Sequence, residues 1–176
     1  MTHEGNPKQR TIVIAVDESP VSKEALEWCL NNFIHKNDNV RLLSVIDSEN
    51  RPAYGTPGGI PMEMGPSDSP DPEQLERRRK LLREYGNMAK KKTNGVKTST
   101  VVSSSLGTSS DHGREICEFA AENNADVLVL GSRGWGSFRR SIMGVFGLGS
   151  VSNFVVNHAT VPNIMIHKHR GSVTKS

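Results

Sequence analysis

Residues 125–134 decide the fold class, and they read Ala-Asp-Val-Leu-Val-Leu-Gly-Ser-Arg-Gly. Four consecutive apolar residues, Val127 to Leu130, follow an aspartate and stop at a glycine. An unbroken apolar run, rather than an alternating one, is typical of a strand buried on both faces of a parallel sheet. A glycine-rich stretch follows, from Gly131 to Gly149, and leads into a short helical pattern. The segment therefore predicts a buried strand, a glycine-rich loop and a helix in succession.

Similar strand patterns occur on both sides of this segment. Residues 11–16 form a continuous apolar run rich in β-branched side chains, which predicts a strand, and residues 39–46 predict a second strand. The run at 96–103 is weaker and more polar, which predicts a strand near an edge of the sheet. Residues 161–167 predict the last strand.

Helical patterns separate these strands. Ser19 or Ser22 can cap a helix whose apolar residues recur every three or four positions. A long helix opens at 71–73, a third spans 113–124, and a short one follows Gly149. Strands that alternate with helices predict right-handed crossovers. The expected fold is therefore α/β: a single-domain, Rossmann-like open five-stranded parallel sheet with helices on both faces.

One domain accounts for the chain, because 176 residues with 35% hydrophobic content suit a single core. We expect residues 1–10 to form a flexible N-terminal segment, residues 11–168 the α/β domain, and residues 169–176 a polar tail. Within the domain, residues 48–72 are rich in Gly, Pro, Ser and Met and show almost no periodicity. Such composition predicts a mobile loop.

Charge and cysteine content exclude several classes of protein. A net charge of +3 is too small to indicate a nucleic-acid partner by itself. The basic residues from Arg77 to Lys92 are expected to form a solvated helix face. Cys29 and Cys117 give neither a disulfide framework nor a metal-ligand spacing. No stretch resembles a signal peptide or a membrane span, so we expect a cytoplasmic protein with no membrane partner.

The chemistry is expected at the carboxyl ends of the strands. In an open parallel sheet a ligand binds outside these ends, where the strand order reverses. Asp17, Val45 with Asp47, and Gly131 lie at predicted strand ends and should converge on one crevice. Glycine lets the backbone approach a phosphate, and the start of a helix presents N–H groups and a partial positive charge. The loop and the helix start add a hydroxyl and three cations that could contact an anion: Ser150, Arg133, Arg139 and Arg140.

The residues alone leave a structural interpretation open. The loop lacks Gly-x4-Gly-Lys-Ser/Thr, so it is not a P-loop, and it does not follow the first strand as a dinucleotide fingerprint would. Glycines are also common in ordinary loops, and Asp17 could simply cap the turn that follows it. Because no nucleophile, base and orienting acid can be assembled, no catalytic residue is assigned, and no metal ligand either.

Taken together, these segments resemble the universal stress protein family, in its ATP-binding, eukaryotic form. The family motif is Gly-x2-Gly-x9-Gly-Ser/Thr. Here fourteen residues separate Gly134 from Gly149. Gly144 lies at the nine-residue spacing, but Val145 follows it in place of Ser or Thr, so a five-residue insertion around 144–148 is favoured over that register. The similarity covers nearly the whole chain and is carried by residues 12–19, 42–45, 125–134, 149–153 and 161–162.

The resemblance implies an adenine-nucleotide site that takes ATP or AMP, with or without Mg²⁺. In this interpretation Asp17 contacts the adenine edge and Val45 lines the base, while the glycines of the motif hold the phosphates. The resemblance also implies a homodimer through the last strand, Val161 to Ile166. The residues implied in nucleotide binding are Ala15, Val16, Asp17, Val45, Leu130, Gly131, Arg133, Gly134, Gly149, Ser150, Val151 and Ser152.

The function implied is that of a stress-response protein whose nucleotide-bound form acts as a binding or signalling module. Two alternatives stay open. One is a weak ATPase with slow turnover, because no Walker lysine is present to stabilise a transferring phosphoryl group. The other is a nucleotide-independent structural dimer whose pocket the insertion has made vestigial.

Overall fold

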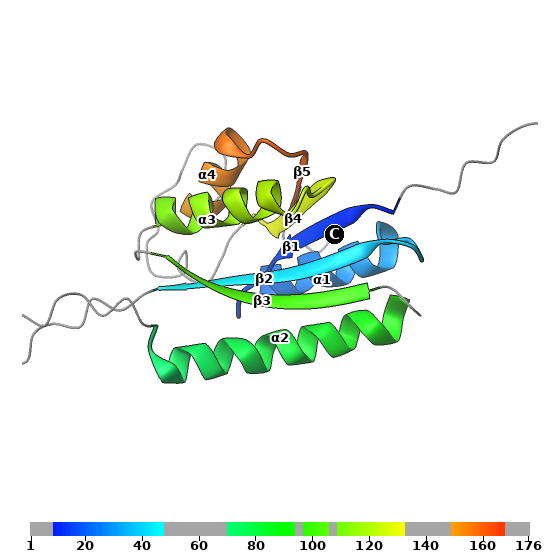
Figure 1. Cartoon of the computed structure of the whole chain (residues 1–176), viewed down its shortest axis with the longest axis horizontal. Helices are drawn as coiled ribbons and strands as arrows, with labels where there is room; N and C mark the ends of the chain where they lie inside the picture. The colour runs from blue at the N-terminus through cyan, green and yellow to red at the C-terminus, as the bar shows by residue number, and fades with distance from the viewer. Residues whose placement is uncertain (1–8, 48–69, 94–96, 106–108, 133–148, 168–176) are drawn as a thin grey trace, which may run out of the picture.

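The computed structural model describes residues 9–47, 70–93, 97–105, 109–132 and 149–167. Strands and helices alternate along these ranges (Figure 1). In chain order the elements are β1 (Thr11–Ala15), α1 (Pro20–Asn32), β2 (Asn39–Asp47), α2 (Pro72–Thr93), β3 (Lys97–Ser105), α3 (Ser109–Glu122), β4 (Val127–Gly131), α4 (Ser150–His158) and β5 (Asn163–Ile166).

The five strands form one sheet in the order β3-β2-β1-β4-β5, and all neighbouring pairs are parallel. The chain starts at the centre, adds β2 and β3 on one side, and then crosses to add β4 and β5 on the other. The strand order therefore reverses between β1 and β4, which is where open parallel sheets place a ligand. The predicted fold class is confirmed, and so is the position of the polar third strand at an edge.

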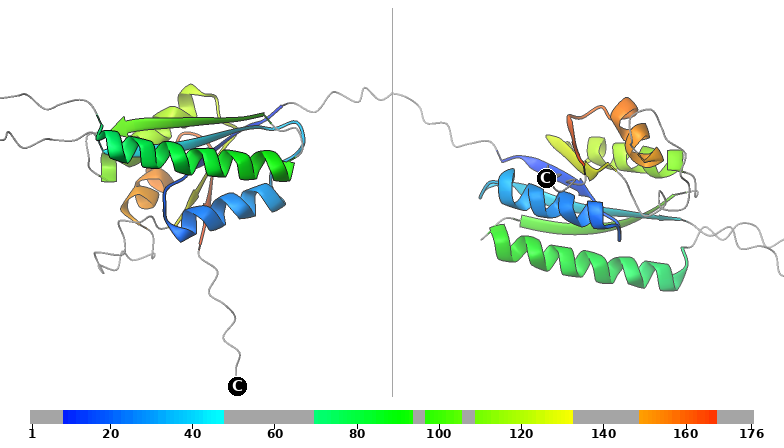
Figure 2. Two further views of the ribbon diagram at one scale, coloured as in Figure 1. Left: turned by 90° about the horizontal axis from the view of Figure 1, so that it is seen from below. Right: turned by 180° about the vertical axis from the view of Figure 1, so that it is seen from behind.

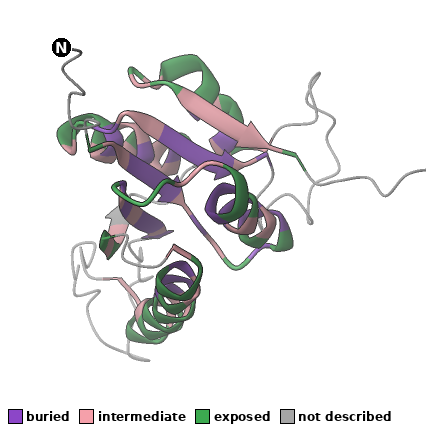
Figure 3. Cartoon of the chain, turned by 90° about the vertical axis from the view of Figure 1, so that its right-hand side faces the viewer, coloured by how far each residue is buried: buried purple, intermediate pink, exposed green. Residues whose placement is uncertain are grey.

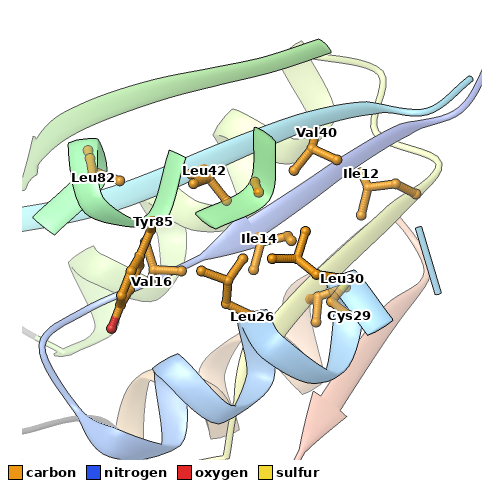
Figure 4. Packing of buried hydrophobic residues seen from close by; sticks show 12 residues of the cluster. Ile12, Ile14, Val16, Leu26, Cys29, Leu30, Val40, Leu42, Leu82 and Tyr85 are labelled. Carbon is orange, nitrogen blue, oxygen red and sulfur yellow. The ribbon is translucent and has the colours of Figure 1, made fainter. Parts of the chain in front are cut away.

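Two helices cover each face of the sheet. α1 and α2 lie on one side, and α3 and α4 lie on the other (Figures 1 and 2). Alternate residues of β1 enter opposite cores: Ile12 and Ile14 join the α1/α2 cluster, and Val13 joins the α3/α4 cluster. Figure 4 shows the first cluster, where Leu26 of α1 and Tyr85 of α2 pack beneath the strands. The strands β1 and β4 at the centre of the sheet are buried on both faces, which explains their unbroken apolar runs (Figure 3).

The two cysteines lie on helices, Cys29 buried and Cys117 half-buried. Cys29 of α1 is buried in the α1/α2 cluster, and burial raises the pKa of its thiol to about 12. Cys117 packs against the other cluster, and burial raises its pKa as well. Among the helices that the structure describes, none is both long and apolar enough to cross a membrane.

Several predicted bounds were wrong. The third helix begins at Ser109 rather than Gly113, because polar residues form its first turn. The last strand spans Asn163–Ile166 instead of 161–167, since Pro162 has no N–H and pairs only through its carbonyl, which accepts from Leu128 N–H at 2.9 Å.

The end of β1 and the start of α2 also differ from the prediction. β1 ends at Ala15, one residue earlier than expected. Pro72, predicted as the end of the mobile loop, is the first residue of α2. Asp71 caps this helix, because its carboxylate accepts from the N–H groups of Glu73 and Gln74. The rest of that loop, residues 48–69, lies outside the described residues, as do 1–8 and 168–176.

Candidate functional site

A row of residues crosses the sheet at the carboxyl ends of its strands. Ala15 of β1 is the register partner of Leu43 on one side and Leu130 on the other. Two residues further along each chain, Asp17 therefore follows β1 at the level of Val45. The predicted convergence of the strand ends on one edge is thus present in the fold, at the point where the order reverses.

The turn after β1 is held by hydrogen bonds to Asp17. Its carboxylate Oδ1 accepts from Ser19 N–H at 2.9 Å, and its own N–H donates to Ser22 Oγ at 2.9 Å. Ser22 N–H donates to Ser19 Oγ at 3.2 Å, and Ser19 is the N-cap of α1. Asp17 therefore has the turn-capping role that general chemistry predicts, whatever else it contacts. Of the two predicted capping serines, Ser19 occupies the cap.

Several apolar residues implied in nucleotide binding, including Val45, which is expected to line the base, share one face of the sheet. Ala15, Val45 and Val151 come from β1, β2 and α4, and all three are half-buried against the α3/α4 cluster. Leu130 belongs to the same cluster and is buried. Val16 differs, because its side chain is only 4% exposed within the α1/α2 cluster on the opposite face. Only the backbone of Val16 can face the same side as Val45.

The start of α4 is fastened to the end of β4. Gly149, the N-cap of α4, donates its N–H to Ser132 O at 2.7 Å. Ser152 Oγ donates to Gly131 O at 2.9 Å, and Ser132 N–H donates to Ile166 O of β5 at 2.7 Å. The first N–H groups of a helix have no partner within it and carry its partial positive charge. The N-terminus of α4 thus lies beside the reversal of strand order, where an anion would be favoured.

The packing around Gly131 leaves little room for a side chain. A Cβ atom at this position would lie 3.0 Å from Val21 Cγ1 and 3.1 Å from the Val21 carbonyl oxygen. A side chain here would therefore need Val21, in the first turn of α1, to move by a few tenths of an ångström. This approach explains the glycine without a phosphate, a reason that the sequence does not reveal.

We expect Gly131→Ala to lower the free energy of unfolding by about 1–2 kcal/mol, because the backbone of Val21 must shift. Urea unfolding of the variant measures this cost. An unchanged free energy of unfolding would show that α1 adjusts freely. The cost also means that a loss of ligand binding in this variant does not by itself identify a phosphate contact.

Tyr85 of α2 lies near several acidic side chains. Burial raises the pKa of the Tyr85 phenol to about 12, and the charges of Asp17 and Glu27, with smaller contributions from Glu84 and Glu18, act in the same direction. Tyr85 lies on α2 and is buried in the α1/α2 cluster beside Val16 (Figure 4). The phenol therefore stays protonated near the carboxyl end of β1 at physiological pH.

Comparison with known proteins decides the family. The pattern of the universal stress protein family matches residues 9–167, which is nearly the whole chain. The chain belongs to the universal stress protein family.

Individual members of the family extend the comparison. Universal stress protein PHOS34 of Arabidopsis thaliana is 27% identical over 167 residues, covering 90% of this chain and 62% of that protein. The chain thus spans less than two thirds of the length of that relative. Universal stress protein UspA of Lactobacillus plantarum has a similar fold, with a TM-score of 0.65, 24% identity, and coverage of 92% of this chain and 99% of that one. A universal stress protein in complex with cAMP has a TM-score of 0.60 at 19% identity, and covers 90% of this chain and 97% of that one.

Part of the predicted site of this universal stress protein lies outside the described residues. Gly134, which completes the first half of the predicted phosphate motif with Gly131, belongs to this part. The predicted cations Arg133, Arg139 and Arg140 and the insertion predicted at 144–148 also lie outside the described residues. Gly149 and Ser150 are described, and Ser150 is exposed at the start of α4. Among the described residues, no group of three or more His, Cys, Asp or Glu side chains could hold a metal ion.

Sequence reasoning missed two features at this edge of the sheet. Ser132 is buried and joins β4, β5 and the start of α4 through its backbone. Ser103 of β3 donates from Oγ to the Glu115 carboxylate of α3. Ser132 directly follows Gly131 of the glycine motif, and this position in the sequence could have drawn attention to it. The second has no local sequence signal, because the partners belong to different elements.

Proposed function

We propose that this universal stress protein binds an adenine nucleotide, ATP or AMP, and acts as a nucleotide-dependent binding or signalling module in a stress response. The observation that carries the proposal is the convergence of three features where the strand order reverses. They are Asp17 after β1, the half-buried Val45 on β2, and the N-terminus of α4 fastened to β4. This combination offers an acceptor, an apolar support and an anion-binding helix start at one edge.

The arrangement suggests how a nucleotide would lie. An adenine ring needs an apolar surface for its faces, and Ala15, Val45 and Val151 contribute half-buried apolar side chains to the same face. Phosphates need N–H donors and positive potential, which the first turn of α4 supplies. The base would therefore lie toward β1 and β2, and the phosphates toward β4 and α4. Mg²⁺ would accompany a triphosphate rather than bind to the described residues.

The proposal connects occupancy to the conformation of α4. A ligand that binds only the folded state stabilises it by about 2.7 kcal/mol at a hundredfold excess over Kd. A nucleotide joined to both β1 and α4 would strengthen the attachment of α4, which already depends on the Gly149–Ser132 and Ser152–Gly131 hydrogen bonds. A partner protein could then distinguish the occupied from the empty form.

The direct test is to identify any nucleotide released by heat from freshly purified protein, and to titrate the emptied protein with ATP, AMP and cAMP in the presence and absence of Mg²⁺. Calorimetry measures the affinities and chromatography identifies the released compound. Release of adenine nucleotide in near-stoichiometric amount, or saturable binding, supports the proposal. An empty protein that binds none of the three contradicts it and favours the nucleotide-independent dimer.

Asp17→Asn tests the adenine contact without removing the turn. The asparagine Oδ1 can still accept from Ser19 N–H, whereas the second carboxylate oxygen becomes an NH₂ donor. We expect the affinity for ATP to fall about tenfold or more, because removing an acceptor from a buried polar contact costs about 1–3 kcal/mol. Glu18→Gln, at the adjacent exposed position, is the matched control and should bind like the wild type. Equal affinities in both variants would remove Asp17 from the site.

We further propose that a second copy of the chain pairs along β5. Among the described strands, β5 lies at the edge of the sheet and pairs only with β4. Edge strands with unpaired N–H and C=O groups commonly add a strand from another chain. Light scattering of Met165→Pro, which removes a backbone donor from β5, against the wild type tests this pairing. A dimeric variant would place the interface elsewhere.

A further inference from the structure

The Ser103–Glu115 pair occupies the β3 end of the row described above. Ser103 of β3 is the register partner of Val45 on β2. Its Oγ donates to Glu115 Oε1 of α3, and both residues are half-buried. Val101, two residues earlier on β3, packs against the α3/α4 cluster, so Ser103 lies on the same face as Val45. The pair therefore adjoins the apolar support proposed for the base.

The spacing of strands brings the pair within reach of a ligand on Val45. Neighbouring strands lie about 4.8 Å apart, and side chains directly opposite one another on one face are in contact. Ser103 of β3 lies beside Val45 of β2, and Asp17, just after β1, lies at the same level of the sheet. A flat ligand that lies across β1 and β2 thus ends beside Ser103.

The direction of the nucleotide decides which of its atoms reaches this end. If the phosphates lie at the N-terminus of α4, beside β4, the ribose and the glycosidic nitrogen of the base face that side. The opposite end of an adenine ring carries the 6-amino group. That group would point away from β4, across Val45 and toward β3.

We propose that Ser103 and Glu115 accept a hydrogen bond from the 6-amino group of adenine and thereby select adenine over 6-oxo purines. This inference rests on the proposed nucleotide site and deepens it, because it names two residues that determine specificity. They lie outside the glycine motif and on two elements, β3 and α3, that the motif does not include.

The chemistry of the pair suits an amino group. A carboxylate has only acceptor atoms, and the hydroxyl hydrogen of Ser103 is already donated to Glu115. The remaining lone pairs of both side chains can therefore accept but not donate. A 6-oxo group would place an acceptor against these acceptors and leave them without hydrogen-bond partners. In a partly buried site, unpaired polar groups lower the affinity. Discrimination by unpaired polar groups is stronger than discrimination by shape.

The test compares ATP with ITP, whose base has a 6-oxo group in place of the 6-amino group. Both are titrated by calorimetry into the emptied wild-type protein and Glu115→Gln. The glutamine keeps an acceptor for Ser103 and adds an NH₂ donor for the 6-oxo group. We expect the wild type to bind ATP more than about tenfold more tightly than ITP. We expect Glu115→Gln to reduce the ratio of the affinity for ATP to that for ITP by about tenfold or more.

Two further variants separate specificity from stability. Glu118→Gln makes the same chemical change at an exposed position of α3 and should keep the wild-type ratio. Ser103→Ala removes the hydroxyl and should lower the ratio even if Glu115→Gln folds poorly. A pair that only fastened α3 to β3 would change the melting temperature without changing the ratio.

The outcomes distinguish this inference from the function on which it rests. If the wild type binds ATP and the ratio is unchanged in Glu115→Gln and Ser103→Ala, the pair does not select the base, and the proposed nucleotide site stands. Equal wild-type affinities for ATP and ITP overturn the inference in the same way. If the wild type binds neither nucleotide, the proposed function fails, and this inference fails with it.

Discussion

Arg10→Ala should lower the free energy of unfolding by about 3 kcal/mol, because it leaves a buried carboxylate without its cation. Asp38 has a side chain that is only 4% exposed, and Arg10 Nη2 lies 2.6 Å from its Oδ2. Arg10 Nε also donates to Asp38 Oδ1 at 2.9 Å, and the guanidinium lies 4.9 Å from the centre of the Phe33 ring. Urea unfolding at neutral pH measures the loss.

The effect of Arg10→Ala should depend on pH. Burial alone raises the pKa of Asp38, but hydrogen bonds from Arg10 and from His35 N–H, with the charge of Arg10, lower it below its ordinary value of 3.8. A lowered pKa gives stability that is present above the unfolded pKa and is lost as the pH falls through the folded one. The difference in stability between wild type and variant should therefore be largest near neutral pH and shrink below about pH 4.

An exposed ion pair supplies the control for this prediction. Arg77 on α2 lies 3.0 Å from Glu73, and both side chains are more than half exposed. Arg77→Ala should change the free energy of unfolding by less than about 0.5 kcal/mol, because solvent screens such pairs. Equal losses in Arg10→Ala and Arg77→Ala would show that burial of Asp38 does not strengthen its dependence on Arg10.

Gly113→Ala should destabilise the protein by about 1–3 kcal/mol, even though alanine favours a helix more than glycine does. A Cβ atom at Gly113 of α3 would lie 2.6 Å from Phe154 Cδ1 and 2.8 Å from Phe154 Cβ of α4. Rotation of the phenyl ring cannot relieve the contact with Cβ, so α4 itself must move. We expect nucleotide affinity to fall as well, since the first turn of α4 belongs to the proposed site.

Gly86→Ala on α2 is the matched control. Its Cβ would meet Thr100 Cγ2 at 3.5 Å, which is an ordinary contact. This substitution should be neutral or stabilise the protein by up to about 1 kcal/mol through helix propensity. Thermal unfolding of both variants compares them directly. If Gly113→Ala is as stable as Gly86→Ala, the close approach of α3 to α4 is not required.

The fold can be predicted well because the buried strands are visible in the sequence as apolar runs. Ile12 and Val13 enter cores on opposite faces of the sheet, and an unbroken apolar run is typical of such a strand. The start of α3 was harder to predict, because Ser109 and Ser110 favour turns and caps as much as helices. The close approaches at Gly113 and Gly131 could not be predicted, since they depend on how helices pack on distant elements.

The candidate site shows a similar division. Asp17 and Val45 could be located because strand ends are visible in the sequence and share one edge of a parallel sheet. The Ser103–Glu115 pair could not, because register decides which serine of the polar strand faces α3. Val16 was assigned to the site only because it precedes Asp17 in the sequence. Side chains alternate along a strand, so that of Val16 lies on the opposite face, in the α1/α2 cluster.

The hydrogen bond from Gly149 N–H to Ser132 O, at 2.7 Å, makes the connection between β4 and α4 a closed ring. For a closed ring, the free-energy cost of bringing the ends together grows only with the logarithm of its length. Lengthening a ring of eleven residues to the sixteen of 133–148 costs about 0.3 kcal/mol on this scale. On this scale, the five-residue insertion that the sequence predicts relative to the family motif would cost the fold little.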